Sequence, residues 1–123
     1  MSELSADPYV TAHDLGCVVI EPGPFELFVD LDGDATQLEI GLTAAISVGL
    51  PIRVTKIVPS KTPGHVHVYL DVDNNGEPLT PERRIALQAV LGSDLKRELF
   101  SLARIMLNVP RAPTIFFETA EED

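Results

Sequence analysis

Two segments of this chain carry apolar residues at the spacing expected of β-strands. In the segment 65–70, apolar and polar side chains alternate, with Val66, Val68 and Leu70 set against His65, His67 and Tyr69. Because successive side chains of a strand point to opposite faces, the apolar set should face a core and the polar set the other side. The second segment, Phe25–Leu31, is mostly apolar and ends in carboxylates. We therefore expect a sheet that packs helices on one face and carries the polar trio on the other.

Helix-end signals mark three helical segments. Thr36 and Glu39 form a capping box at the start of the first. Thr80 followed by Pro81 is typical of a helix start, and Ser93 caps a further helix. The expected elements, in chain order, are strands at 17–21 and 25–31, a helix at 36–49, strands at 52–58 and 65–72, helices at 81–91 and 94–107, and a strand at 114–118.

This order of elements predicts a single α+β domain. We expect a mainly antiparallel sheet with helices packed on one face, in an RRM-like arrangement. The first two strands, joined by Pro22-Gly23-Pro24, are expected to form a hairpin. By this interpretation residues 1–14 are an irregular arm, residues 15–118 are the domain, and residues 119–123 are an acidic tail.

Composition narrows the classes of protein to which the chain can belong. Its 123 residues, of which 45% are hydrophobic, are enough for one globular core. No apolar run of about 18 residues occurs, so neither a membrane-spanning helix nor a membrane partner is expected. The N-terminus lacks a basic region followed by an apolar core, unlike a signal peptide. The single cysteine, Cys17, cannot form an internal disulfide, which favours a cytoplasmic protein.

Charge is unevenly distributed along the chain. The formal net charge is −10, from nine basic and 19 acidic residues. All the basic residues lie between Arg53 and Arg111, whereas both ends of the chain are acidic. The negative charge counts against broad electrostatic binding to nucleic acid, which needs a basic surface. It would suit a basic protein partner, on which an acidic patch can imitate phosphate.

Asp30 and Asp32 stand two positions apart where the strand at 25–31 ends. Residues i and i+2 of a strand share a face, so the two carboxylates should lie side by side. Hard divalent cations such as Mg²⁺ and Mn²⁺ are bound by oxygen ligands of this kind. The alternative is an acidic turn that closes the strand, because Asp-Gly-Asp at 32–34 is also good turn chemistry.

A polar turn precedes the alternating strand. The turn Ser60-Lys61-Thr62-Pro63-Gly64 supplies hydroxyls, backbone N–H groups and an ammonium, all of which suit phosphate. His65 and His67 follow on the polar face of the strand, which predicts an anion or metal site. The alternative is the solvated face of an ordinary strand.

Taken together, these segments resemble the archaeo-eukaryotic primase superfamily, in particular its compact primase–polymerase branch. The family's first motif, an apolar strand ending in Asp-x-Asp, resembles Leu27–Asp32. Its second, a Ser/Thr/Gly turn before a strand with His and an aromatic residue, resembles Ser60–Leu70, with His67 at the family's histidine. Its third, an apolar-plus-Asp element, resembles Leu91–Asp94. The helical stretch with a late Arg that follows is similar to Lys96–Arg104.

The resemblance implies a metal-dependent nucleotidyltransferase, a minimal primase or polymerase that serves replication or repair of a small replicon such as a phage or plasmid. It implies acids that bind two Mg²⁺ or Mn²⁺ ions, and a turn and histidine that hold a triphosphate. Carried over by position, the catalytic and metal-binding residues are Asp30, Asp32 and Asp94, and the nucleotide-binding residues are Ser60, Lys61, His67 and Arg104. The implied partners are a nucleoside triphosphate and nucleic acid.

The chain also departs from the family pattern. It is short for a primase, has no Cys/His zinc module, and places His65 where the family has a small residue. Asp94 is also explained as an acid at a helix start, and Arg104 as a solvated helix residue. Two other functions therefore stay open. One is a catalytically inactive relative, such as a phage accessory protein, that binds a nucleotide or a protein. The other is a metal-dependent nuclease or phosphohydrolase.

Overall fold

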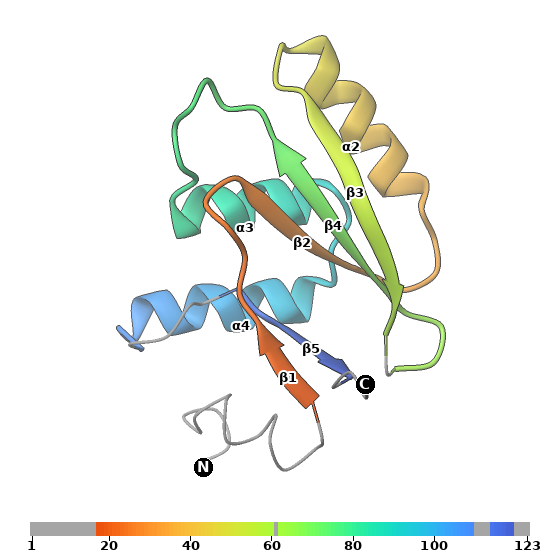
Figure 1. Ribbon diagram of the computed structural model, residues 1–123, viewed down its shortest axis with the longest axis vertical. Coiled ribbons are helices and arrows are strands. Elements are labelled where there is room, and N and C mark those ends of the chain that lie inside the picture. The colour runs from red at the N-terminus through yellow and green to blue at the C-terminus, as the bar shows by residue number, and fades with distance from the viewer. Residues whose placement is uncertain (1–16, 61, 110–113, 120–123) are drawn as a thin grey trace.

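The computed structural model describes residues 17–60, 62–109 and 114–119. These residues form five strands and three helices in the order expected from the sequence, and the α+β class is confirmed (Figure 1). The strands are β1 (Cys17–Ile20), β2 (Glu26–Leu31), β3 (Ile52–Pro59), β4 (Val66–Val72) and β5 (Phe116–Thr119); the helices are α2 (Thr36–Ser47), α3 (Pro81–Val90) and α4 (Leu95–Met106). None of these helices is long and apolar enough to span a membrane.

The strands form two antiparallel sheets. The larger has the order β2-β4-β3, and the smaller pairs β1 with β5 (Figure 1). The predicted hairpin of the first two strands is therefore wrong. The connection between them makes a tight turn, in which the N–H of Glu26 donates to the carbonyl of Gly23. Pro22 and Pro24 lack the N–H groups that a ladder needs, so β1 continues away from β2 and pairs with β5.

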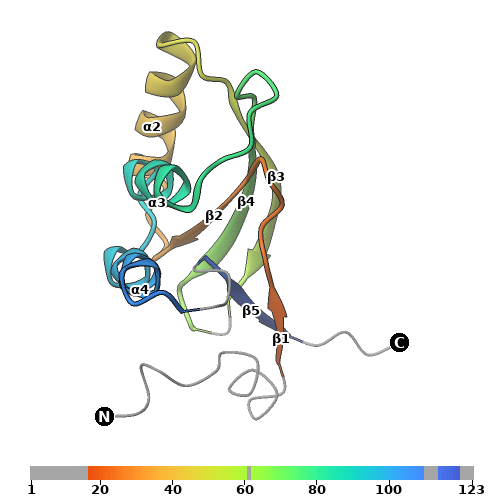
Figure 2. The ribbon, with the colours of Figure 1, turned by 90° about the vertical axis from the view of Figure 1, so that its left-hand side faces the viewer.

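All three helices lie on one face of the larger sheet, as predicted (Figure 2). The core between the sheet and the helices consists of alternate strand residues and the residues that face them: Leu27, Val29, Leu31, Ile52, Val68, Leu70, Val72, Leu38, Ala45, Leu79 and Leu91. The period-two pattern of the sequence therefore identified the buried face of the sheet correctly.

Part of the opposite face of the larger sheet is covered by β5. The ring of Phe116, in β5, stacks on Phe28 with centroids 4.6 Å apart and on His67 with centroids 3.8 Å apart. Tyr69 meets the same ring edge-on. Phe28, Tyr69 and Phe116 form a second buried cluster, so β5 covers part of the face that carries the polar trio.

The helix starts differ in how well the sequence predicted them. Thr80 caps α3 as expected, because its hydroxyl accepts from the N–H of Arg83. The capping box of α2 is absent: Ala35 is its N-cap and makes no side-chain bond. Asp34 instead accepts from the N–H of Thr36. The predicted Ser93 cap of α4 is also wrong, since Asp94 is the N-cap and Ser93 bonds to β2 instead.

The outer edge of β2, which faces away from β4, is covered by polar groups rather than by another strand. Residues of α3, of α4 and of their connection bond to its backbone: Arg84 to Glu26 O, Gln88 to Phe28 N, Arg97 to Phe28 O, Ser93 to Asp30 N, and Asp94 N to Asp30 O. Uncovered strand edges invite pairing with other chains, and this arrangement closes one of them. It also fixes the end of β2 against the start of α4.

Candidate metal centre

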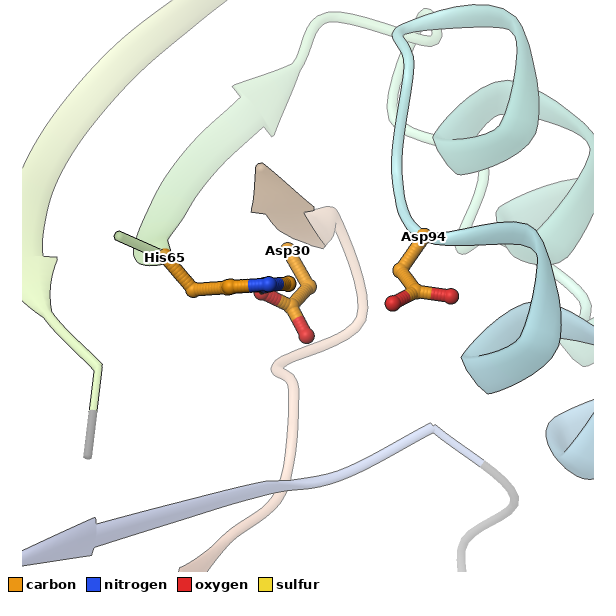
Figure 3. A group of neighbouring side chains, drawn as sticks. All are labelled: Asp30, His65 and Asp94. Carbon is orange, nitrogen blue, oxygen red and sulfur yellow. The ribbon is translucent and has the colours of Figure 1, made fainter. Parts of the chain in front are cut away.

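Three side chains from distant parts of the sequence converge where β2 ends (Figure 3). Asp30 lies near the end of β2, His65 directly precedes β4, and Asp94 is the N-cap of α4. One ligand atom from each side chain lies within 4.8 Å of the other two. The Nδ1 atom of His65 is 3.3 Å from Oδ1 of Asp30. All three residues are half-buried, so the cluster is both positioned by the fold and open to a ligand.

The edge bonds of β2 explain why Asp30 and Asp94 meet. The N–H of Asp30 donates to the hydroxyl of Ser93 over 3.0 Å, and the N–H of Asp94 donates to the carbonyl of Asp30 over 2.9 Å. These two bonds join the strand end to the helix start. The distance between the two carboxylates therefore depends on backbone contacts and does not require a metal to hold them together.

Asp94 has a structural role in addition to its place in the cluster. Its Oδ1 atom accepts from the N–H of Lys96 over 2.9 Å and from that of Arg97 over 3.4 Å. An N-cap carboxylate is favoured at this position by the unpaired N–H groups and by the helix dipole. The structural and the metal-binding interpretations of Asp94 are thus compatible with each other.

His65 is held by a tight turn that begins at Ser60. The N–H of Ser60 donates to the carbonyl of His65, and the N–H of His65 donates to the carbonyl of Thr62. The loop that follows β2 packs against this turn: a Cβ atom on Gly33 would lie 3.0 Å from the carbonyl oxygen of Gly64. The two segments that the sequence singled out for metal and phosphate are therefore neighbours in space.

The other predicted metal ligand, Asp32, is not part of the cluster. It follows the end of β2 at Leu31 and is exposed. A strand places residues i and i+2 on one face only while it continues as a strand, and β2 has ended before Asp32. Asp32 therefore lies just beyond the strand, and the side-by-side placement of Asp30 and Asp32 stays a prediction.

The predicted phosphate ligands are dispersed. The hydroxyl of Ser60 accepts from the N–H of Thr62, within the turn beside His65. Lys61 lies outside the described residues. Arg104 lies ten residues beyond Asp94 along α4, which corresponds to about 15 Å of helix rise, and is half-buried. Of the described two, Ser60 is the one that lies in the turn beside His65.

His67 differs most from its prediction, which placed it on an exposed strand face. It is 6% exposed, its ring is stacked on Phe116, and its Nδ1 atom is 3.0 Å from Oε2 of Glu118. The alternation of the sequence identified the face of the strand correctly but gave no information about β5, which covers it. A histidine sealed between a phenylalanine ring and a carboxylate is not placed to bind phosphate.

Glu118 joins His67 to Tyr69 beneath β5. The hydroxyl of Tyr69 donates to the same Oε2 atom that lies beside His67. Burial, together with this carboxylate, raises the pKa of Tyr69 above its usual range. The polar trio of the segment 65–70 is therefore split between two places: His65 belongs to the metal cluster, while His67 and Tyr69 pack under β5.

A buried polar network behind the cluster was missed at the level of sequence. Arg97 donates to Oε2 of Glu98 over 2.6 Å, and Gln88 donates to Oε1 of Glu98 over 2.9 Å. Burial lowers the pKa of Arg97 and raises that of Glu98. Arg97 also bonds to Ser93, which accepts from Asp30. The network supports the backbone that carries Asp30 and Asp94. The sequence shows that α4 has a polar side, but it does not show that this side faces the interior of the protein.

A cleft lies at the other end of the larger sheet. It has a volume of about 830 Å³ and is lined by the start of β2, the start of β3 and the end of β4, including Glu26, Arg53 and Asp71. Arg53 and Asp71 pair there with a separation of 3.5 Å. Its carboxylates do not suit an anionic ligand, so we place the candidate chemistry at the cluster of Asp30, His65 and Asp94.

No family model, curated protein or solved structure matches this chain. A function therefore has to be argued from the site. Two carboxylates and one imidazole make a mixed oxygen and nitrogen donor set, which suits Mn²⁺ or Zn²⁺ better than the all-oxygen environment that Mg²⁺ prefers.

Proposed function

We propose that this protein binds a divalent cation through Asp30, His65 and Asp94 and uses it in nucleotidyl transfer, as a compact primase–polymerase-like enzyme of the cytoplasm. The convergence of these three side chains carries the proposal. They come from the three separate segments that resemble the primase superfamily. A chance acidic patch would not be expected to draw one residue from each of them.

The proposed site differs from the one inferred from the resemblance in its histidine and in its metal. His65 becomes a metal ligand because it is the histidine beside Asp30, whereas the resemblance assigned His67 to the triphosphate. Mn²⁺ is favoured over Mg²⁺, since one of the three ligands is a nitrogen atom. A bound cation would supply the positive charge that phosphate oxygens require during transfer.

The surroundings of the cluster suit a triphosphate. The turn beside His65 includes the small residues Ser60 and Gly64, and the loop at Gly33 borders it. Phosphoryl transfer needs position and charge more than it needs a covalent intermediate. In this proposal the chain contributes rigid placement: the edge bonds of β2 hold Asp30, and the cap bonds of α4 hold Asp94.

The test is incorporation of labelled nucleotides into a primed template, with DNA and RNA templates compared and with Mn²⁺ or Mg²⁺ added. We expect activity with Mn²⁺ that is lost in Asp30→Asn and in Asp94→Asn. Asp73→Asn is the matched control, because Asp73 is an exposed aspartate beside the cleft at the opposite end of the sheet. Equal activity in Asp30→Asn and Asp73→Asn would overturn the proposal.

The burial of His67 removes one residue that the resemblance assigned to the active site. This favours a second candidate, a relative that binds a nucleotide or a protein without catalysis. In that case a nucleoside triphosphate would bind in the presence of Mn²⁺, and the binding would require Asp30, but no product would form. Equilibrium binding of a labelled triphosphate, measured beside the transfer assay, separates the two candidates.

A further inference from the structure

Helix α4 is turned with its polar side inward and its apolar side outward. The buried residues of α4 are polar, namely Glu98 and Ser101, which are 3% and 1% exposed. Most of its apolar residues and its C-cap Leu107 lie at the surface: Leu95 is 67% exposed, Leu99 65%, Phe100 38%, Leu102 36%, Met106 73% and Leu107 75%, whereas Ile105 is half-buried. Amphipathic helices of globular proteins normally have the opposite orientation.

The polar network behind β2 explains this orientation. Arg97 reaches the carbonyls of Phe28 and Ile115, and Glu98 bonds with Arg97 and Gln88. A helix that uses its polar side to satisfy a strand edge has to place its apolar side elsewhere. In Figures 1 and 2, α4 lies at the end of the helical layer, with α3 between it and α2, so no other helix of the described residues lies on its far side.

The spacing of the exposed residues indicates another helix as the occupant. Leu95, Leu99, Leu102 and Met106 are separated by four, three and four positions. This is the d-a-d-a spacing of a coiled-coil seam, which packs against a helix carrying the same pattern. The seam is nearly symmetric about its centre, between Leu99 and Leu102, so it matches a copy of itself running in the opposite direction.

Charge also favours a second copy at this surface. The chain as a whole is strongly acidic, with a net charge of −10. The carboxylates of α4 and its N-cap, however, are turned away: Glu98 is buried, and Asp94 caps the helix. Lys96 is exposed beside the seam. Two copies of the chain would therefore meet here without carboxylates facing each other across the contact.

We propose that this protein forms a homodimer through antiparallel pairing of α4 with α4 of a second copy. Leu99 packs against Leu102 of the second copy, Leu95 packs against its Met106, and each contact occurs twice about a two-fold axis. The N-terminus of each helix lies beside the C-terminus of the other, which suits their dipoles. The dimer does not depend on the proposed metal chemistry, because no seam residue belongs to the cluster.

Sedimentation equilibrium of the full chain tests the dimer. We expect the unaltered protein to be dimeric at micromolar concentrations, and Leu99→Glu and Leu102→Lys each to be monomeric. Mixing these two variants should recover a dimer, because in antiparallel pairing the Glu of one chain lies opposite the Lys of the other. Ile46→Glu is the matched control: Ile46 is also helical and 65% exposed, and its substitution should leave the dimer intact.

Three outcomes would overturn the proposal. The unaltered chain could sediment as a monomer well above micromolar concentration, in which case the seam is covered by another segment of the chain or by a different protein. Leu99→Glu could remain as dimeric as Ile46→Glu, which would place the interface elsewhere. The mixture could stay monomeric, which would exclude the antiparallel register. Circular dichroism checks that each variant is folded, and the exposed positions chosen make loss of the fold unexpected.

Discussion

His65 and His67 stand two residues apart on one face of the same segment, yet their surroundings differ. The side chain of His65 is 24% exposed and faces Asp30, whereas that of His67 is 8% exposed and lies beside Glu118. The pattern of the sequence treats the two residues as equivalent, because period two places both on the same face. The difference arises from β5, which covers one residue and stops short of the other.

This contrast leads to a pair of opposite predictions. His67→Ala should destabilise the protein by about 2 kcal/mol, because it removes a buried ring from the stack with Phe116. The same substitution should leave Mn²⁺ affinity unchanged. His65→Ala should cost less than about 1 kcal/mol of stability and should abolish Mn²⁺ binding. Urea unfolding and calorimetric titration measure the two effects, and a reversal of this pattern would restore His67 as the metal-site histidine.

The buried hydroxyl of Tyr69 predicts a loss of stability in alkali. Its pKa is raised by burial and by Glu118, whereas in the unfolded chain it should lie near 10. A group whose pKa is raised by folding stabilises the fold below its unfolded pKa. That contribution is lost as the pH rises further. The free energy of unfolding should therefore fall above about pH 10, and less steeply in Tyr69→Phe. Urea unfolding at a series of pH values measures both slopes, and identical slopes would contradict the assignment.

At the scale of elements, the covered edge of β2 is the feature that positions the site. Gln88 is fully buried, accepts from the N–H of Phe28 and donates to Glu98. Gln88→Met keeps the length of the side chain but removes the partner of the Phe28 N–H and of the Glu98 carboxylate. It should lower the free energy of unfolding by about 3 kcal/mol. Urea unfolding measures the change. Gln37→Met is the control, because Gln37 is exposed, and it should cost less than about 0.5 kcal/mol. Equal losses would mean that the edge bonds contribute little.

The elements also show how far the sequence alone could predict the structure. Alternation along β4 gave the buried face of the sheet, and the Thr80-Pro81 pair gave the start of α3. Both signals are local. The pairing of β1 with β5 joins segments about a hundred residues apart, and nothing within either segment specifies the partner. The amphipathic pattern of α4 was visible, but its orientation depends on the network around Glu98.

The candidate site was predictable to a similar extent. Asp30 was identified as a carboxylate at the end of an apolar strand and Asp94 through the resemblance to the primase superfamily, and the structure brings them together. Asp32 was included because it stands two positions after Asp30 at the end of the strand, but β2 ends at Leu31 and Asp32 lies beyond it. His65 and His67 were both candidates for an anion or metal site, and the resemblance to the primase superfamily gave the role to His67. The choice between the two histidines required knowledge of the covering strand, which is a long-range contact.

At the scale of the whole molecule, the net charge opposes association of two chains, whereas the apolar seam of α4 favours it. Two chains with a net charge of −10 repel at long range, while the seam attracts at contact. Salt screens the repulsion, with a Debye length that falls from about 30 Å at 0.01 M to about 10 Å at 0.1 M. The dimer should therefore strengthen as ionic strength rises. Sedimentation equilibrium at several salt concentrations measures this, and weakening by salt would indicate an interface built on ion pairs instead.

The most direct test of the account is a calorimetric titration of the whole protein with Mn²⁺, compared among the unaltered chain, Asp94→Asn and Asp32→Asn. Asparagine caps a helix about as well as aspartate, so Asp94→Asn keeps the start of α4 and removes the charged ligand. We predict that one Mn²⁺ binds to the unaltered protein and to Asp32→Asn, and that Asp94→Asn loses binding. Absence of binding to the unaltered chain, or equal binding to Asp94→Asn, would contradict a metal centre formed by Asp30, His65 and Asp94.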